Sequence, residues 1–222
     1  MTVTGTTQLS ALEEGRAFVE LAGWRTVAVR GSDARAWLHD LITADIEGLR
    51  PGEARRSLLL TPTGRIRADL QVGADRDGFV LLQAPDQPDP VVTILARYVL
   101  SSDVTLEDRT ETTSVFAVLG GEAAEDGESF SPSLLDTGRT VLVRAGDVAE
   151  RLREHLRGLG LVEVSTDAIE AWRILHARPR MMADFGQDAL PAEAGLESAI
   201  DFTKGCFLGQ ESVAKVRNLG HP

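Results

Sequence analysis

The sequence is poor in several residue types, and each shortage excludes a class of protein. Among its 222 residues there is one cysteine, Cys206, so no disulfide can form within the chain. The four histidines show no ligand spacing with Cys206 or with one another, and we expect no structural zinc site and no bound metal. The chain also contains no G-x-G-x-x-G after a strand, no G-x-x-x-x-G-K-[ST] and no G-x-S-x-G. Dinucleotide-binding, P-loop and α/β-hydrolase sites are therefore excluded.

Long apolar stretches and positive charge are scarce as well. No segment approaches the roughly 18 uncharged residues of a membrane span, and the N-terminus lacks the basic and apolar parts of a signal peptide, so we expect a cytoplasmic protein without membrane contact. The net charge of -11 argues against non-specific nucleic-acid binding, which requires many cations to neutralise phosphates. Only Lys204 and Lys215 among the 23 basic residues are lysines. Their proximity indicates either sites that need a compact ammonium or a chance clustering.

The periodicity of the apolar residues predicts an α+β protein with mixed or antiparallel sheets. A turn at 61–64 separates two strands of a hairpin. The remaining predicted strands are 25–30, 78–83, 104–106, 115–119 and 141–143. The predicted helices are 33–43, 91–101, 147–157 and 167–178. After Pro179 the pattern becomes largely non-periodic for about forty residues, with no helix or strand to close it. A structureless segment of that length is usually functional.

The densest group of reactive side chains lies in this last segment, in the octapeptide KGCFLGQE at 204–211. Lys204 could lower the pKa of the Cys206 thiol or hold an anion, and we take these two as candidate catalytic residues. Gln210 and Glu211 supply an amide and a carboxylate that can recognise the edge of a flat heterocycle. The residues alone also allow a simpler interpretation, a glycine-rich turn around a small buried cysteine.

The octapeptide resembles the K-G-C-[FY]-x-G-Q-E signature of the YgfZ family, folate-binding relatives of the T-protein, the aminomethyltransferase of the glycine cleavage system. The similarity extends over VAVRGSDARAWLHDLITADIEGL and LLLTPTGRIRADLQV in the first half, and over RPRMMADF and the segment from ALPAEAGLESAIDF through the octapeptide in the second. It covers roughly residue 24 to the end. The resemblance makes a functional Cys206 the favoured interpretation.

The resemblance implies a GcvT-like fold of two interleaved α+β domains, with a C-terminal β-barrel completing a ring around a tetrahydrofolate site. We expect the first domain at 1–50 and 113–203, the second at 51–112, and at 204–222 a signature loop leading to a barrel that this sequence does not contain. We therefore expect the chain to end early. The apolar residues that such a barrel would cover are Phe207, Leu208, Val213, Val216 and Leu219.

Two departures from the T-protein pattern concern the folate site. The pattern R-x-E-x-G, whose glutamate holds the pterin, corresponds to residues 173–177, where Leu175 replaces the glutamate. Asp184 or Glu193 could take over that role, since a carboxylate suits the donors of a pterin. The nearest candidate for the catalytic aspartate of the T-protein is Asp89, for which capping a helix is a simpler role.

Positive charge for the anionic tail of a folate is available on both sides of Pro179. Arg178 and Arg180 lie in an extended stretch whose alternation projects both side chains to one side. We expect these arginines, Asp184, Gln210 and Glu211 to bind the cofactor.

The leading hypothesis is a folate-binding accessory protein that assists assembly or repair of iron-sulfur proteins, with tetrahydrofolate as ligand and iron-sulfur client proteins as partners. The alternative is a folate-dependent one-carbon transferase that acts on an aminomethyl or N-methyl donor. A protein-interaction module is the third. A carboxylate at the reactive carbon of the folate would favour the transferase, whereas an exposed Cys206 without such a carboxylate would favour the accessory role.

Overall fold

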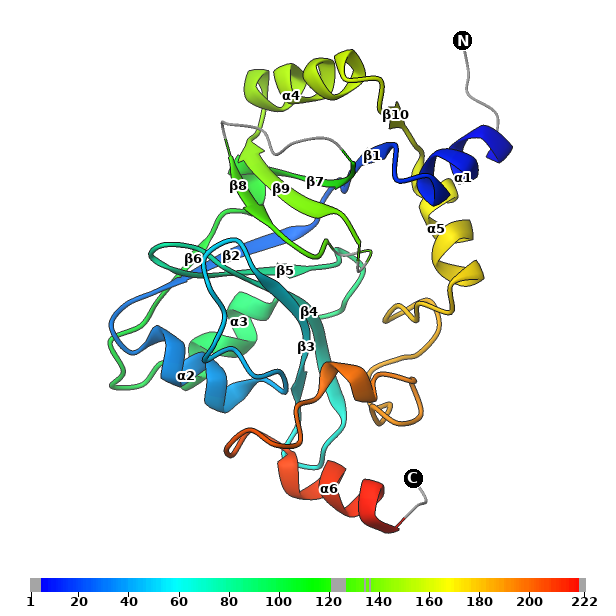
Figure 1. The fold of residues 1–222 in the computed structure, drawn as a ribbon. Coiled ribbons are helices and arrows are strands. Elements are labelled where there is room, and N and C mark those ends of the chain that lie inside the picture. Colours follow the sequence, from blue (N-terminus) through cyan, green and yellow to red (C-terminus); the bar gives the residue numbers. More distant parts are fainter. Residues whose placement is uncertain (1–4, 121–126, 134, 136, 220–222) are drawn as a thin grey trace. The chain divides into compact units, whose positions relative to one another are not determined.

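The computed structural model describes residues 5–120, 127–133, 135 and 137–219 (Figure 1). The chain forms two compact units. The first unit comprises Met1–Trp24 and Thr110–Arg178, and the second comprises Arg25–Arg109 and Pro179–Pro222. Each unit contains one five-stranded sheet with helices, so the α+β class expected from the sequence is confirmed. Among the described residues, no helix combines the length and apolar character needed to cross a membrane.

The sheet of the first unit has the strand order β10-β1-β7-β9-β8. Its neighbouring strands are antiparallel, except that β1 and β10 are parallel. The strands are β1 (Ala17–Glu20), β7 (Thr113–Leu119), β8 (Glu128–Phe130), β9 (Arg139–Arg144) and β10 (Val162–Glu163), and the helices are α1 (Gly5–Glu13), α4 (Asp147–Gly158), α5 (Thr166–Leu175) and the 3-10 turn η2 (Thr110–Thr112).

The core of the first unit forms where α4 packs on its sheet. Ala149, Leu152 and Leu156 recur at helical spacing on α4 and are all buried. They join Phe18 of β1 and Phe116 of β7 in one apolar cluster. The polar side chains of α4 occupy the remainder of the helix, which explains why the sequence predicts this helix almost to the residue.

The sheet of the second unit has the order β3-β4-β5-β2-β6 and is antiparallel throughout. Its strands are β2 (Arg25–Arg30), β3 (Ala54–Leu60), β4 (Ile66–Ala74), β5 (Gly78–Gln83) and β6 (Thr105–Asp108). Its helices are α2 (Ala34–Leu41), α3 (Val91–Leu95), α6 (Gln210–Leu219) and the 3-10 turns η1 (Ala96–Tyr98) and η3 (Glu197–Ala199). The predicted hairpin is β3–β4, joined around residues 61–64.

Both faces of β3 are covered, and the second cover comes from the C-terminal segment. Successive side chains of a strand point to opposite faces. Leu59 accordingly belongs to the apolar cluster that includes the helices α2 and α3, whereas Leu58 and Leu60 belong to a second cluster. That second cluster contains the following buried residues from the segment after Pro179: Met181, Ala194, Leu196, Ala199, Ile200, Phe207 and Val213. The segment therefore forms one wall of the core.

The units divide the chain after Trp24, Arg109 and Arg178, whereas the sequence analysis placed the divisions after residues 50, 112 and 203. The pairing of strands explains the difference. β2 is hydrogen-bonded to β5 and β6, so residues 25–30 are part of the second sheet. The residues after Pro179 join the second unit because they cover β3. Neither relationship is visible in local periodicity.

The C-terminal segment differs from the sequence prediction in two respects. It contains a helix, α6, where the sequence indicated no further element. Phe207 and Val213, which we expected to need a barrel for cover, are 6% and 5% exposed within the second unit. Leu208 packs against the cluster of α2 and α3. Burial of these side chains fixes the loop that carries the octapeptide.

Candidate functional site

The octapeptide begins in a turn that Asp201 organises. Its Oδ1 accepts hydrogen bonds from the backbone N–H of Thr203 at 2.7 Å, from the Thr203 hydroxyl at 2.6 Å and from the backbone N–H of Lys204 at 3.2 Å. The bonds from Thr203 are the main reason why the pKa of Asp201 lies below its ordinary value. The backbone N–H of Asp201 in turn donates to the carbonyl of Thr43 at 2.9 Å. The turn thus delivers Lys204 to the segment that follows α2.

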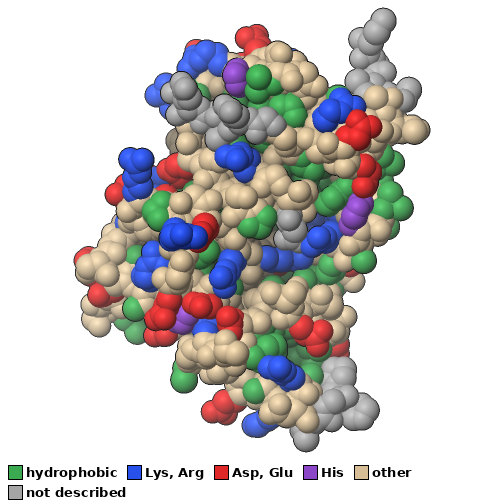
Figure 2. All heavy atoms as spheres, viewed as in Figure 1, with side chains coloured by type: hydrophobic (Ala, Val, Ile, Leu, Met, Phe, Trp, Pro, Cys, Tyr) green, Lys and Arg blue, Asp and Glu red, His purple; other side chains and the backbone are tan. Residues whose placement is uncertain are grey.

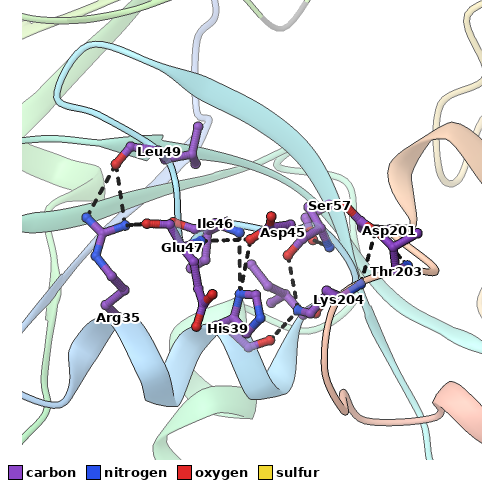
Figure 3. Close-up of polar contacts among 12 residues, drawn as sticks. Arg35, His39, Asp45, Ile46, Glu47, Leu49, Ser57, Asp201, Thr203 and Lys204 are labelled. Carbon is purple, nitrogen blue, oxygen red and sulfur yellow. Dashed lines mark hydrogen bonds and ion pairs between the residues drawn. The ribbon is translucent and has the colours of Figure 1, made fainter.

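Lys204 is tied to the end of α2 by its ammonium group (Figure 3). Nζ donates to the carbonyl oxygens of Ile42 at 2.8 Å and Ala44 at 3.1 Å, and also to the carbonyl of His39. The last carbonyls of a helix have no partner within it and carry its negative dipole end. An ammonium has three N–H donors, and here each has a carbonyl acceptor.

Two opposing effects act on the charge of Lys204. Its partial burial lowers the pKa to about 8, because desolvation penalises the ammonium form. Asp45, Asp40 and Asp201, together with a weaker effect of Glu47, raise it. Lys204 is therefore surrounded by acidic side chains, and its pKa lies closer to neutral pH than that of a solvated lysine.

The second glycine of the octapeptide lies against the β3–β4 turn. Gly209 has φ +82°, and a Cβ at this position would stand 2.5 Å from the carbonyl oxygen of Thr61. In the turn, Gly64 has φ +78°, and its Cβ would stand 2.8 Å from the Cβ of Ser212. The Ser212 hydroxyl donates to the carbonyl of Pro62 at 3.3 Å. Glycine is needed at both positions because the two backbones approach each other closely.

Cys206 lies between these anchors and is exposed. The next residue, Phe207, is buried, and the Lys204 ammonium lies 5.4 Å from the centroid of its ring. Gln210 and Glu211 form the first turn of α6, where Gln210 is partly exposed and Glu211 is exposed. The structure therefore brings four of the predicted site residues together on one loop and helix start of the second unit.

His39, Asp45 and Glu47 form a cluster beside Lys204 that the sequence analysis missed. Figure 2 shows acidic side chains gathered around a histidine on the face in view. One ligand atom from each of the three residues lies within 4.8 Å of the others, so their donor set could hold a metal ion. His39 Nδ1 lies 3.6 Å from Asp45 Oδ1 and accepts from the backbone N–H of Ile46 at 3.4 Å. The sequence signal was the pair of carboxylates Asp45 and Glu47 within six residues of the end of α2, where the helix dipole favours a cation.

The comparisons with known proteins agree with this architecture. Residues 6–131 match the GCVT N-terminal domain family. The chain belongs to this family. A crystal structure of glycine cleavage system aminomethyltransferase T from Bartonella henselae has the same fold, with a TM-score of 0.78 over 96% of this chain and 67% of that chain at 19% identity. The GcvT-like fold implied by the resemblance is confirmed.

Relatives in sequence include two proteins named tRNA-modifying protein YgfZ. The one from Klebsiella pneumoniae is 26% identical over 90% of this chain and 67% of its own length, and the one from Vibrio atlanticus is 22% identical over 90% and 65%. A chloroplastic protein of Arabidopsis thaliana is 25% identical over 94% of this chain and 54% of its own length. The chain thus spans between about half and two thirds of these relatives, and its resemblance to the YgfZ proteins is confirmed.

Arg178, Arg180, Asp184 and Glu193, which the resemblance led us to expect near a folate, have the following surroundings. Arg178 ends the first unit and is exposed, and Arg180 belongs to the second. Arg180 Nη1 pairs with Asp86 Oδ2 at 2.5 Å, and its backbone N–H donates to Asp184 Oδ2 at 2.8 Å. Glu193 Oε2 accepts from the backbone N–H of Leu190 at 2.8 Å.

Leu175 and Asp89 are the positions where the chain departs from the T-protein pattern. Leu175 is 70% exposed at the end of α5. Asp89 does not cap α3 with its side chain, contrary to the role suggested from sequence. Its Oδ2 instead pairs with Arg67 at 2.8 Å and accepts from the Gln187 amide at 3.1 Å. Gln83 Nε2 donates a hydrogen bond to the backbone carbonyl of Asp89 at 2.9 Å. Both the backbone and the carboxylate of Asp89 are therefore fixed by residues from other segments.

Proposed function

We propose that this chain is a folate-binding accessory protein of the YgfZ type, which acts in the cytoplasm and assists assembly or repair of iron-sulfur proteins. Membership of the GCVT N-terminal domain family and similarity to the YgfZ proteins support the proposal that the ligand is a folate. The observation that carries the accessory role is the placement of Cys206. It is exposed on a loop whose flanking residues Lys204, Phe207 and Gly209 are all anchored.

An exposed and positioned thiol suits chemistry on another protein. Cys206 is exposed, and reactive cysteines are typically exposed at least in part, whereas structural cysteines are buried. Thiolates are also the ordinary ligands of iron-sulfur clusters. The loop therefore has the geometry to contact an iron-sulfur client, and Cys206 is the residue we assign to that contact.

The chemistry of the described residues fits a reduced folate in part. Guanidinium groups suit the carboxylates of its tail, and Arg178 or Arg180 would supply one. Asp184, or Gln210 with Glu211, offers the acceptors that a pterin edge needs, in place of the glutamate that Leu175 replaces. A bound tetrahydrofolate would supply a carrier for a one-carbon group.

The alternative is a folate-dependent one-carbon transferase. A transferase needs a carboxylate free to act at the reactive carbon, and Asp89 is the candidate. In this structure its Oδ2 forms an ion pair with Arg67 and accepts a hydrogen bond from the Gln187 amide. Both contacts use Oδ2, and the exposure of Cys206 is the observation that favours the accessory role.

The names of the YgfZ relatives mention tRNA modification. We propose that any effect of this chain on tRNA is exerted through client proteins. The net charge of -11 does not suit direct binding to a polyanion. A filter-binding assay with bulk tRNA at physiological salt should detect no complex, and a complex of micromolar affinity would contradict this part of the proposal.

Calorimetry with tetrahydrofolate tests the proposed ligand. We expect saturable binding to the intact wild-type protein, and a roughly tenfold weaker affinity for Arg178→Gln or Arg180→Gln, since a charge-assisted hydrogen bond contributes about 1.5–3 kcal/mol. Arg76→Gln is the matched control, because Arg76 is an exposed arginine of the second unit outside the expected site. Absence of any binding heat at millimolar tetrahydrofolate would refute the proposal.

A further inference from the structure

We propose that Lys204 is a positioning residue: its ammonium fills a cation cradle of three backbone carbonyls and thereby holds the loop that presents Cys206. The functional importance of Cys206 rests on the proposed function, whereas the role of Lys204 in holding the loop does not. It replaces the assignment of Lys204 as a catalytic group, which the octapeptide by itself suggested.

The cradle is a set of acceptors that a single small cation can satisfy. The carbonyls of His39, Ile42 and Ala44 all accept from Nζ, and they come from the last turn of α2 and the residues that follow it. An ammonium is a compact charge with three donors, whereas a guanidinium is a planar fork. The chain uses arginine almost everywhere else, so the geometry explains a lysine at this position.

The cradle is rigid independently of Lys204. Thr43 is fully buried, and its hydroxyl donates to the carbonyl of Ala199 at 2.7 Å and accepts from the backbone N–H of Leu58 at 2.8 Å. The backbone N–H of Ala44 donates to the buried Ser57 hydroxyl at 2.9 Å. The bonds to Ser57 and Leu58 fix residues 43 and 44 on β3. Loss of the lysine side chain should therefore leave the carbonyls in place, with room for another small cation.

The position of Lys204 explains how it acts on Cys206. Cys206 lies two residues after Lys204 and one before the buried Phe207. Lys204 is thus the anchor on one side of the thiol, and Phe207 with Gly209 is the anchor on the other. Because all three Nζ donors are engaged by carbonyls, none is left to hold a substrate. Without the ammonium, residues 204–206 would be held only from the Phe207 side.

The sole cysteine allows a direct test by electron paramagnetic resonance of a nitroxide attached to Cys206. We compare the wild type with Lys204→Ala, Lys204→Met and Lys204→Arg, and use Lys215→Ala as the matched control, because Lys215 is the other lysine and lies exposed on α6. We expect at least a twofold shorter rotational correlation time in all three Lys204 variants and none in the control. Methylammonium should restore the wild-type spectrum of Lys204→Ala, whereas tetramethylammonium at equal ionic strength should not, since it cannot donate hydrogen bonds.

A second measurement uses the unmodified protein and so does not depend on how the variants fold. With ¹⁵N-lysine the chain gives only two side-chain signals. We expect the Lys204 ammonium protons to exchange with water at least tenfold more slowly than those of Lys215 at pH 6. Equal exchange, or unchanged Cys206 mobility in folded Lys204→Ala, would overturn the inference. Failure of tetrahydrofolate binding with the expected spectra would instead refute the proposed function and leave the cradle standing.

Discussion

Gly209 and Gly205 flank the exposed thiol in the same octapeptide, yet their surroundings differ enough to predict opposite responses to alanine. Gly209 has φ +82°, and its added Cβ would meet the Thr61 carbonyl oxygen at 2.5 Å and the Leu60 Cβ at 3.1 Å. At Gly205 no described heavy atom beyond its chain neighbours lies within 4 Å of the Cβ position, and φ lies outside the left-handed region. Gly205→Ala is therefore a matched control for Gly209→Ala.

The expected loss for Gly209→Ala combines two costs and one gain. Left-handed backbone costs a residue with a Cβ about 1–2 kcal/mol. Overpacking against a backbone atom that cannot rotate away costs about 1–3 kcal/mol. The lower conformational entropy of the unfolded alanine chain returns about 0.4–1 kcal/mol. We therefore expect Gly209→Ala to lower the free energy of unfolding of the second unit by about 3 kcal/mol, which corresponds to a decrease in Tm of about 6–12 °C for a chain of this size.

Gly205→Ala should change the same free energy by less than about 1 kcal/mol, in the stabilising direction. The assay is urea unfolding followed by circular dichroism, with amide exchange measured by mass spectrometry. Exchange should accelerate in the β3–β4 turn and at the start of α6 for Gly209→Ala, because these two segments are forced apart. A difference below about 0.5 kcal/mol between the two variants would refute the close approach of Gly209 to the Thr61 carbonyl.

Three further predictions concern the thiol, the lysine and the core. Cys206→Ser should change stability by less than about 1 kcal/mol but abolish cellular function, measured by melting and by complementation under oxidative stress; a large melting loss with function retained per folded molecule would make Cys206 structural. The pKa of Lys204 is about 8 in the folded chain and 10.5 ordinarily, so the unfolded chain binds more protons between these pH values. The free energy of unfolding of the wild type relative to Lys204→Met should therefore rise from pH 8 to pH 10.5 and be level below pH 8. A fall across that window in urea unfolding would contradict the burial of the ammonium. Leu156→Ala should cost about 2–5 kcal/mol and accelerate exchange in α4 and β9 while leaving a Cys206 label unaffected; equal effects on the label would show that the two units do not respond separately.

Local features of the sequence determined the class of the protein and much of its secondary structure. The spacing of Ala149, Leu152 and Leu156 predicted α4, and the turn at 61–64 predicted the β3–β4 hairpin. These succeed because helical and strand periodicities depend on neighbours in the chain. The octapeptide likewise indicated the family and a candidate functional loop around Cys206 before any contact was known, whereas the exposure of the thiol came from the structure. It did not indicate α6. Among the described side chains of this helix only Val213 is buried, and a single buried residue does not produce an apolar stripe in the sequence.

The tertiary structure alone decided which groups meet. Lys204 is separated along the chain from the three carbonyls that accept its hydrogen bonds. The neighbouring residues in the sequence do not distinguish a lysine that positions a loop from one that lowers the pKa of a thiol or binds an anion. The contacts of Asp89 are also long-range, since Arg67 and Gln187 belong to other segments of the chain. The unit boundaries also depended on distant pairing, that of β2 with β5 and β6. Backbone carbonyls have no residue type, so a site built from them leaves no mark on the sequence, and only the fold brings the ammonium of Lys204 to the end of α2.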